Sequence, residues 1–117
     1  GEAARDIWKT IQALPGYHIL VAVEGGEVLS SCTLLIVPNL THGGRPYGVV
    51  ENVVTHLSHR GKGFATACLD YARKLAEKQR CYKLMLMTGS KQESTLRFYR
   101  EAGYRDDQKT AFVQWLP

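Results

Sequence analysis

The chain has 117 residues, a net charge of +4 and 44% hydrophobic residues, a composition that excludes a disordered protein and predicts one domain over residues 1–117. Its apolar runs fall far short of the ~20 residues that span a bilayer, which excludes a membrane protein, and its Lys and Arg residues are too scattered to indicate a nucleic-acid binder. Three cysteines without metal-ligand spacing, Cys32, Cys68 and Cys81, predict reduced thiols, a cytoplasmic location and no metal site.

The first segments predict a helix and a β-hairpin. Apolar residues recur at helical spacing over residues 3–14, and Pro15-Gly16 ends the pattern. Two runs rich in β-branched residues, Tyr17–Glu24 and Val28–Pro38, flank the two-residue turn signal Gly25-Gly26. We therefore expect a hairpin after a short helix.

A valine-rich strand with polar interruptions comes next. Residues 39–47 have the Gly, Pro and Asn content of a loop, and Gly48–Thr55 predicts a strand. Strict alternation divides this strand into two faces, with Val49, Glu51, Val53 and Thr55 on one and Val50, Asn52 and Val54 on the other. A carboxylate and a carboxamide thus interrupt an otherwise buried strand.

The following segments predict a helix and a second strand. The pattern from Gly63 to about Lys78 is amphipathic, and Asp70 and Lys74 form a favourable pair four residues apart. The apolar run Tyr82–Met87 is typical of a central strand covered on both faces. The order strand, helix, strand predicts a right-handed crossover between parallel strands, and ligands of such units bind at the carboxyl ends of the strands.

The last segments predict a helix and a final strand. Ser90 and Glu93 match the S-x-x-E capping box, and the helix that they start would run to about Ala102, with Gly103 as its C-terminal cap. Thr110–Leu116 predicts one more strand. The complete order of elements indicates a mixed α/β or α+β domain.

A basic glycine turn, Arg60-Gly61-Lys62-Gly63, lies between the valine-rich strand and the long helix. A helix N-terminus offers free N–H groups and a partial positive charge, and glycines let the backbone approach an anion, so the turn is a candidate phosphate site. A solvated turn capped by glycine explains the same letters. The dinucleotide fingerprint fails at Thr66, and the P-loop pattern fails at Phe64.

Three segments in order resemble the GNAT superfamily of acyl-CoA-dependent N-acyltransferases. They are residues 60–65, which match Arg/Gln-x-x-Gly-x-Gly/Ala, CYKLMLM at 81–87 and LRFYREAGY at 96–104. The resemblance covers about residues 3–116 and implies the GNAT fold, a mixed central sheet flanked by helices. The family's first strand and first helix would precede Gly1, so we expect a trimmed chain whose open sheet edge favours a homodimer.

This resemblance implies acetyl-CoA as the acyl donor. The turn would bind the coenzyme A pyrophosphate, the strand edge would pair with the pantetheine arm, and an amide near Val53 would hold the oxyanion. The implied cofactor-binding residues are Val53, Val54, Thr55, Arg60, Gly61, Lys62, Gly63, Phe64, Ala65 and Thr66.

Acetyl transfer to an amine needs a base, an oxyanion donor and an acid. An alkyl amine with a pKa of about 10.4 must lose a proton before it attacks, and Glu51 is the best candidate base, directly or through a water. A carboxylate paired with a lysine is the alternative. The resemblance makes Tyr99 the candidate acid for the leaving thiolate, against a tyrosine packed in the core. We expect His56 and His59 on the surface and Cys68 in the core.

The amine acceptor stays open at this point. VENVV at 50–54, CYK at 81–83 and Phe98-Tyr99 resemble the glucosamine-6-phosphate N-acetyltransferases. Met87-Thr88, however, stands where that subfamily has an acidic residue. Candidate acceptors are an amino sugar phosphate, a polyamine, an amino acid, an aminoglycoside or a protein N-terminus, because fold does not fix substrate.

Two arginines are candidates to bind the acceptor. Arg45, in the loop, and Arg97, on the last helix, could contact a phosphate or carboxylate of the acceptor, or could be solvated surface charges. A catalytically silent acyl-CoA-binding sensor or interaction module is the alternative to an enzyme, although the presence of both Glu51 and Tyr99 argues for catalysis.

Overall fold

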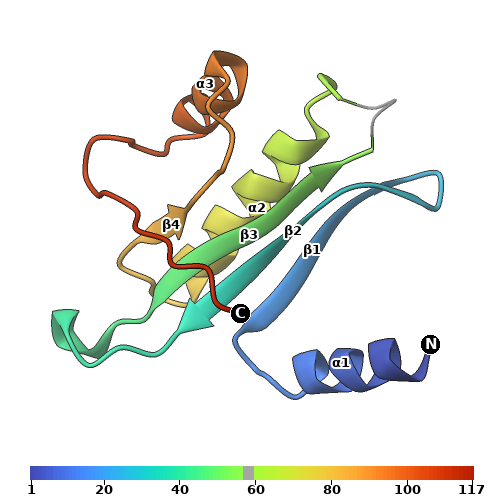
Figure 1. The fold of residues 1–117 in the computed structure, drawn as a ribbon, viewed down its shortest axis with the longest axis horizontal. Coiled ribbons are helices and arrows are strands. Elements are labelled where there is room, and N and C mark those ends of the chain that lie inside the picture. Colours follow the sequence, from blue (N-terminus) through green and yellow to red (C-terminus); the bar gives the residue numbers. More distant parts are fainter. Residues whose placement is uncertain (57–59) are drawn as a thin grey trace. The chain divides into compact units, whose positions relative to one another are not determined.

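The computed structural model describes residues 1–56 and 60–117. It forms two compact units, Gly1–Leu86 and Met87–Pro117. The elements in chain order are α1 (Glu2–Gln12), β1 (Tyr17–Glu24), β2 (Glu27–Val37), the 3-10 turn His42–Gly44, β3 (Tyr47–Thr55), α2 (Phe64–Lys78), β4 (Leu84–Leu86) and α3 (Glu93–Glu101) (Figure 1). The mixed α/β class is confirmed, while a single domain over the whole chain stays a prediction.

The first unit is built on a four-stranded sheet in the order β1-β2-β3-β4. β1, β2 and β3 run antiparallel, and β4 pairs parallel to β3, as the crossover predicts. The predicted hairpin turn is confirmed, since Glu24 pairs with Glu27 across Gly25 and Gly26, which have φ angles of 60° and 79°. Only residues that tolerate a positive φ make this tight turn, which explains the two glycines.

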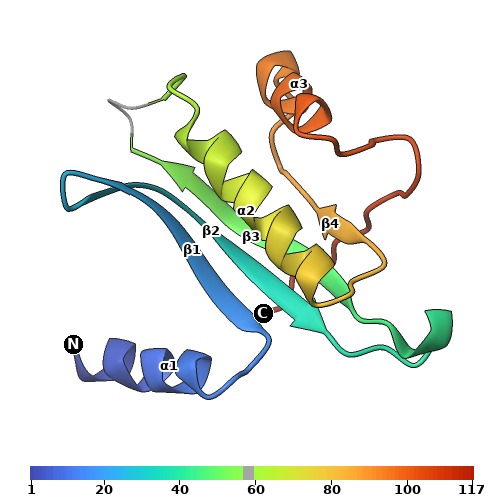
Figure 2. The same ribbon diagram turned by 180° about the vertical axis from the view of Figure 1, so that it is seen from behind.

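Helix α2 covers one face of the sheet and makes the core (Figure 2). Its small side chains Cys68, Ala72 and Ala76 are buried, so the helix backbone approaches the strands closely. Leu34 and Val50 meet it from the sheet, and each is at most 1% exposed. The prediction that Cys68 is a core residue is confirmed.

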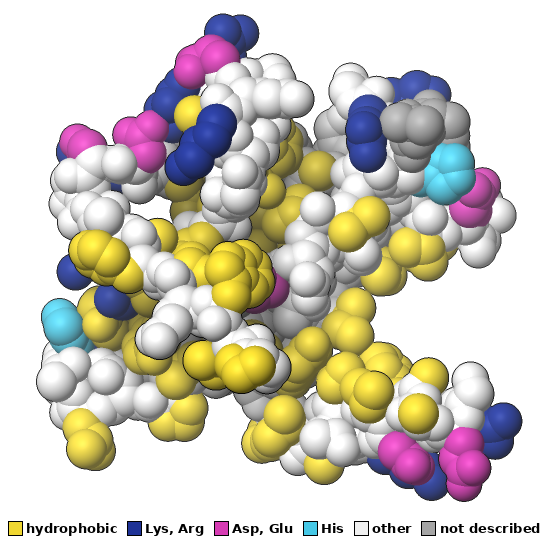
Figure 3. Space-filling view, viewed as in Figure 1, with side chains coloured by type: hydrophobic (Ala, Val, Ile, Leu, Met, Phe, Trp, Pro, Cys, Tyr) yellow, Lys and Arg dark blue, Asp and Glu magenta, His cyan; other side chains and the backbone are white. Residues whose placement is uncertain are grey.

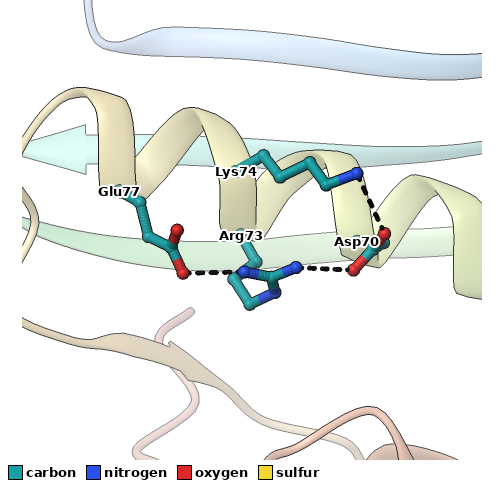
Figure 4. A network of polar contacts seen from close by, with 4 residues as sticks. All are labelled: Asp70, Arg73, Lys74 and Glu77. Carbon is teal, nitrogen blue, oxygen red and sulfur yellow. Dashed lines mark hydrogen bonds and ion pairs between the residues drawn. The ribbon is translucent and has the colours of Figure 1, made fainter.

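The outer side of α2 carries a chain of charges (Figure 4). Arg73 lies between Asp70 and Glu77, with N–O distances of 2.9 and 2.7 Å, and Lys74 reaches Asp70 at 3.5 Å. The expected pair of Asp70 and Lys74 is therefore present. All four side chains are exposed, so water screens these contacts and they add little to stability beyond favouring the helix.

Helix α1 confirms the first predicted helix and is amphipathic (Figure 3). Apolar side chains line one side of it and charged side chains line the other. Ile7 and Trp8 remain 62% and 48% exposed. Among the described residues, no helix is long and apolar enough to cross a membrane.

The second unit contains α3, whose C-terminus agrees with the prediction while its N-terminus does not. Gly103 has a φ of 101°, its N–H donates to Arg100, and the Tyr104 N–H donates to Tyr99, which is the Schellman arrangement. The predicted capping box is wrong. The helix begins at Glu93 after Gln92, and the Ser90 hydroxyl accepts from the Gln92 N–H at 3.2 Å instead.

Two strand predictions need correction. Residues 110–116 form no strand and are exposed, because the second unit holds no other strand to which an isolated run could pair. The run Tyr82–Met87 forms a strand only at Leu84–Leu86, and β4 lies at an edge of the described sheet, not at its centre. Alternation and apolarity report burial, whereas a strand also requires a partner backbone.

Candidate active site

A β-bulge interrupts β3 in the middle of the VENVV segment. Glu51 pairs with Thr33 and Val54 pairs with Ser31, so two residues of β3 oppose the single residue Cys32 of β2. Asn52 stands at this point with a φ of 53°, a left-handed conformation that Asn tolerates better than other residues with a side chain. The bulge therefore shifts the register by one residue at the point where the strand carries its polar groups.

This bulge corrects the predicted faces of the strand. Cross-strand partners share a face, so Thr55 lies on the face of Ser30, where the two hydroxyl oxygens are 3.0 Å apart. Glu51 lies on the opposite face, with Thr33. The prediction that Glu51 and Thr55 share a face is therefore wrong, because the one extra residue reverses the alternation.

The end of β3 has one unpaired edge among the described residues. β4 pairs with β3 only at Gly48–Val50, so the strand continues to Thr55 with β2 as its single neighbour. The His56 N–H donates to Leu29 of β2 at 2.8 Å. Because successive amides of a strand point to opposite edges, the N–H groups of Thr55 and Val53 point to the unpaired edge.

The glycine turn that follows has a conformation that other residues avoid. Gly61 and Gly63 have φ angles of 78° and 84°, and a Cβ at either position would meet no atom within 4 Å. The glycines are thus required by the backbone conformation, and the space beside them is open. Arg60 and Lys62 are exposed, so their charges add to an approachable backbone.

The N-terminus of α2 is open to an anion. Gly63 is its N-cap, no side chain caps it, and its first turn holds no acidic residue. The first helical bond runs from the Ala67 N–H to the Gly63 carbonyl at 3.0 Å, which leaves the amides of Ala65 and Thr66 without an acceptor inside the helix. Free amides and an uncompensated helix dipole fit a pyrophosphate.

Glu51 is half-buried at the start of the unpaired part of β3. Over residues 1–56 and 60–117, no ion pair joins its carboxylate to a lysine. The alternative of a paired strand carboxylate thus gains no support. A carboxylate that is half out of water and not engaged with a cation is available to accept a proton.

The other predicted site residues are distributed over both units. Tyr99 and Arg97 lie on α3 of the second unit. Tyr99 is half-buried, and the centroid of its ring lies 5.2 Å from that of Phe98. Arg97 is exposed. His56 is exposed at the end of β3, as expected, and His59 falls outside the described residues.

Arg45 makes two structural hydrogen bonds. Its Nε and Nη2 donate to the carbonyls of Arg80 and Cys81 at 3.0 and 3.1 Å. Arg45 lies before the first residue of β3. The bulge lies in the second half of this strand, and the glycine turn follows the strand. Its predicted role in binding the acceptor therefore finds no support in these contacts and stays a prediction.

The cysteines do not offer a nucleophile. Burial raises the pKa of the Cys32 thiol to about 11, and the adjacent Cys68 thiol adds to the rise. The reactive thiolate is therefore scarce at neutral pH. In the described part of the chain, no group of three or more His, Cys, Asp and Glu side chains could hold a metal ion.

Strict alternation and motif matching both missed Asn52. The signal that could have found it is an Asn inside a valine-rich strand, since Asn is depleted in strands and enriched at left-handed positions.

A separate apolar hollow of about 400 Å³ between β1 and α2 contains none of the predicted site residues. The open strand edge and the glycine turn, not this hollow, form the candidate site.

Comparisons with known proteins identify the family of the chain. A family model described as the acetyltransferase (GNAT) family matches residues 2–104. A curated glucosamine 6-phosphate N-acetyltransferase from Trypanosoma brucei brucei is 35% identical over 80 residues, which make up 68% of this chain and 52% of that protein. The chain thus spans about half the length of this curated relative.

Solved structures show the same fold. One from Agrobacterium tumefaciens str. C58, provisionally named an acetyltransferase, has a TM-score of 0.90 at 37% identity and covers 96% of this chain and 78% of its own. Glucosamine-6-phosphate N-acetyltransferase from Arabidopsis thaliana has a TM-score of 0.87 at 18% identity, with 99% and 78% covered. The fold, the glycine turn and the family match agree, and the chain belongs to the acetyltransferase (GNAT) family.

Proposed function

We propose that the protein is an acetyl-CoA-dependent N-acetyltransferase that acetylates a primary amine by direct attack within a ternary complex. The observation that carries the proposal is that, among the described residues, the unpaired edge of β3 is followed along the chain by a helix N-terminus with no side-chain cap and no acidic residue in its first turn. A strand edge suits the amide groups of a pantetheine arm, and the helix terminus suits a pyrophosphate.

The residues of the junction divide the binding of the donor between them. The amides of the turn and first helical residues, 60–66, would hold the pyrophosphate, helped by the charges of Arg60 and Lys62. The backbone of Val53–Thr55 would pair with the pantetheine arm. Bound in this way, acetyl-CoA supplies an activated acetyl thioester, and the Val53 N–H would donate to its carbonyl oxygen.

Glu51 would act as the base. An alkyl ammonium group, with a pKa of about 10.4, is protonated at neutral pH and must lose a proton before its nitrogen is nucleophilic. Glu51 is half-buried beside the unpaired edge and is not engaged by a lysine of the described chain, so its carboxylate can accept that proton directly or through a water.

Tyr99 would act as the acid. Its phenol can donate a proton to the thiolate that leaves when the acetyl group is transferred. This role rests on the resemblance of the segment 96–104 to the corresponding family segment and on the side chain being only half-buried on α3.

An amino sugar phosphate is the acceptor that the comparisons favour. The curated relative at 35% identity is a glucosamine 6-phosphate N-acetyltransferase. We favour Arg97, exposed on α3, over Arg45 for binding that phosphate, because Arg45 already donates to two carbonyls.

Three free cysteines favour a reducing, cytoplasmic compartment. β1 lies at an edge of the sheet that the described residues form, and such an edge would suit a homodimer.

A screen of amines tests the function. The purified protein is incubated with acetyl-CoA and each of glucosamine 6-phosphate, spermidine, amino acids, aminoglycosides and an N-terminal peptide, and free thiol release is measured. We expect release above the amine-free rate with one class, led by the amino sugar phosphate. Tight acetyl-CoA binding without turnover of any amine would favour the silent acyl-CoA sensor instead.

A further inference from the structure

A buried serine of β2 is bonded to β3 directly after the bulge. Ser30 is 2% exposed, and its Oγ donates to the Val54 carbonyl at 2.9 Å. The Thr55 Oγ1 lies 3.0 Å from the same Ser30 oxygen. Because the single Ser30 proton is directed at Val54, the Thr55 hydroxyl is the donor in this second bond. Ser30 thus forms hydrogen bonds with two consecutive residues of β3.

These bonds act where the sheet is otherwise weakly held. Beyond the bulge, the ladder between β2 and β3 consists of Ser31 with Val54 and Ser30 with Thr55, followed by the bond from His56 to Leu29. β2 has its own irregularity beside Ser30, since the pairing with β1 shifts between Ala22 and Val23. A short ladder between two irregularities leaves the rotation of the strand end poorly fixed by backbone bonds alone.

The geometry of the pair adds to this conclusion. Because the neighbouring His56 N–H bonds to β2, the pair of Ser30 and Thr55 is one that exchanges no backbone bonds, and the Thr55 amide points to the unpaired edge. Side chains of such pairs lie close together, which lets the two hydroxyls meet. The side-chain contact therefore fixes the direction of the very amides that the strand offers at its open edge.

We propose that Ser30 is a positioning residue for the acyl donor: its hydroxyl holds Val54 and Thr55 so that the Thr55 amide faces the pantetheine arm and the Val53 amide faces the acetyl carbonyl at the end of that arm. This inference rests on the proposed function and assigns a role to a residue that does not itself touch the donor. Ser30 is bonded to β3 and not to the glycine turn at the start of α2. Its hydroxyl therefore orients the amides that would bind the pantetheine arm and leaves the amides proposed to bind the pyrophosphate unaffected.

Calorimetry with two ligands separates this role from a merely structural one. Acetyl-CoA carries both the pyrophosphate and the pantetheine arm, whereas adenosine 3′-phosphate 5′-diphosphate carries the pyrophosphate alone. For Ser30→Ala, we expect acetyl-CoA affinity to fall about fivefold, the value of one to two neutral hydrogen bonds, while affinity for the shorter ligand changes less than about twofold.

Three further variants make the test specific. Ser30→Thr keeps the hydroxyl and should restore acetyl-CoA affinity. Thr55→Val removes the partner hydroxyl at a less buried position and should reproduce about half of the loss, which covers the case in which Ser30→Ala fails to fold. Leu34→Val is a core change further along β2 that should lower stability and leave both affinities at the wild-type value.

Each result decides the proposal. Unchanged acetyl-CoA affinity in both Ser30→Ala and Thr55→Val, or an equal loss for the two ligands, would overturn the positioning role. Failure of the wild-type protein to bind either ligand would overturn the proposed function itself, and this outcome is distinguished because it needs no variant.

Discussion

The two halves of β3 differ in almost every respect although they belong to one strand. At Gly48–Val50 the strand is paired on both edges, and Val50 is 1% exposed beneath α2. From Glu51 to Thr55 it is paired on one edge, bulged at Asn52 and half open to solvent. The first half anchors the second in the core, so a rigid strand ends in backbone groups that are free to bind a ligand.

The glycine turn offers the strongest way to break the ligand-binding half. In Gly63→Val, a β-branched residue must adopt a φ of 84°, which forces the turn out of its conformation and moves its amides away from the proposed pyrophosphate site. We expect acetyl-CoA affinity by calorimetry to fall more than about a hundredfold. Gly43→Val, with a similar φ of 68° and no atom within 4 Å of its Cβ, is the matched control and should bind normally. Equal loss in both variants would contradict the role of the turn.

Replacing the carboxylate of Glu51 tests the first residue of the open half. Glu51→Gln keeps the shape of the side chain and removes the proposed base, so we expect kcat/KM for the amine to fall on the order of a hundredfold with unchanged acetyl-CoA affinity. The limb of the pH-rate profile that reports the base should shift or vanish. Thr33→Val, at the paired position on β2, is the control. A wild-type pH profile in Glu51→Gln would exclude Glu51 as the base.

The second unit is tested through Tyr99. Tyr99→Phe keeps the ring and removes the proton donor, so we expect kcat to fall about tenfold, less than for Glu51→Gln because a thiolate leaves readily without a proton. Acetyl-CoA affinity should stay constant. Phe98→Leu, its neighbour on α3, separates packing from proton donation. An unaltered kcat in Tyr99→Phe would rule out the assigned acid.

Cys32 tests the boundary between the two halves of β3, because it is the residue of β2 that lies opposite the bulge. Burial raises the pKa of its thiol from 9.0 to about 11, and Cys68 adds to the rise. A pKa raised by folding gives stability that is complete below pH 9 and is lost as the pH rises towards 11. Relative to Cys32→Ala, the wild-type free energy of unfolding should therefore fall by about 1 to 2 kcal/mol over this range.

Urea titrations at pH 8 and pH 10.5 measure this difference. Ser31→Ala, a neighbour on β2 without a titratable group, should run parallel to the wild type at both values. If the difference in free energy of unfolding between wild type and Cys32→Ala is the same at both pH values, water reaches the Cys32 thiol and the strand is not tightly packed opposite the bulge.

The features that could be predicted from sequence are those that depend on neighbouring residues. The turn at Gly25-Gly26, the pair of Asp70 and Lys74 and the cap at Gly103 each follow from local backbone or side-chain geometry. The glycines at 61 and 63 are also a local signal: the sequence predicts a turn there, and their positive φ angles are ones that favour glycine. These features are predictable because each depends on residues that are close together in the sequence.

The features that were missed depend on partners distant in the chain. The bulge at Asn52 exists only relative to β2, and it decides on which face Thr55 lies. The run 110–116 has the composition of a strand and no strand beside it in its unit. Ser90 and Glu93 match both specified positions of the capping box, but the Ser90 hydroxyl accepts from the amide of Gln92 instead. Pattern rules fail where several partners compete for one group.

In the proposed function, the open half of β3 and the glycine turn together hold the acyl donor. An amide-resolved NMR titration of the isotope-labelled protein with acetyl-CoA tests this shared site. The amide signals of Val53, Thr55, Gly61 and Gly63 should move together, with one saturation curve, while those of the apolar hollow between β1 and α2, such as Val21 and Tyr71, stay fixed. Movement confined to the hollow, with the strand edge and turn unchanged, would show that the donor binds elsewhere and would overturn the proposed site.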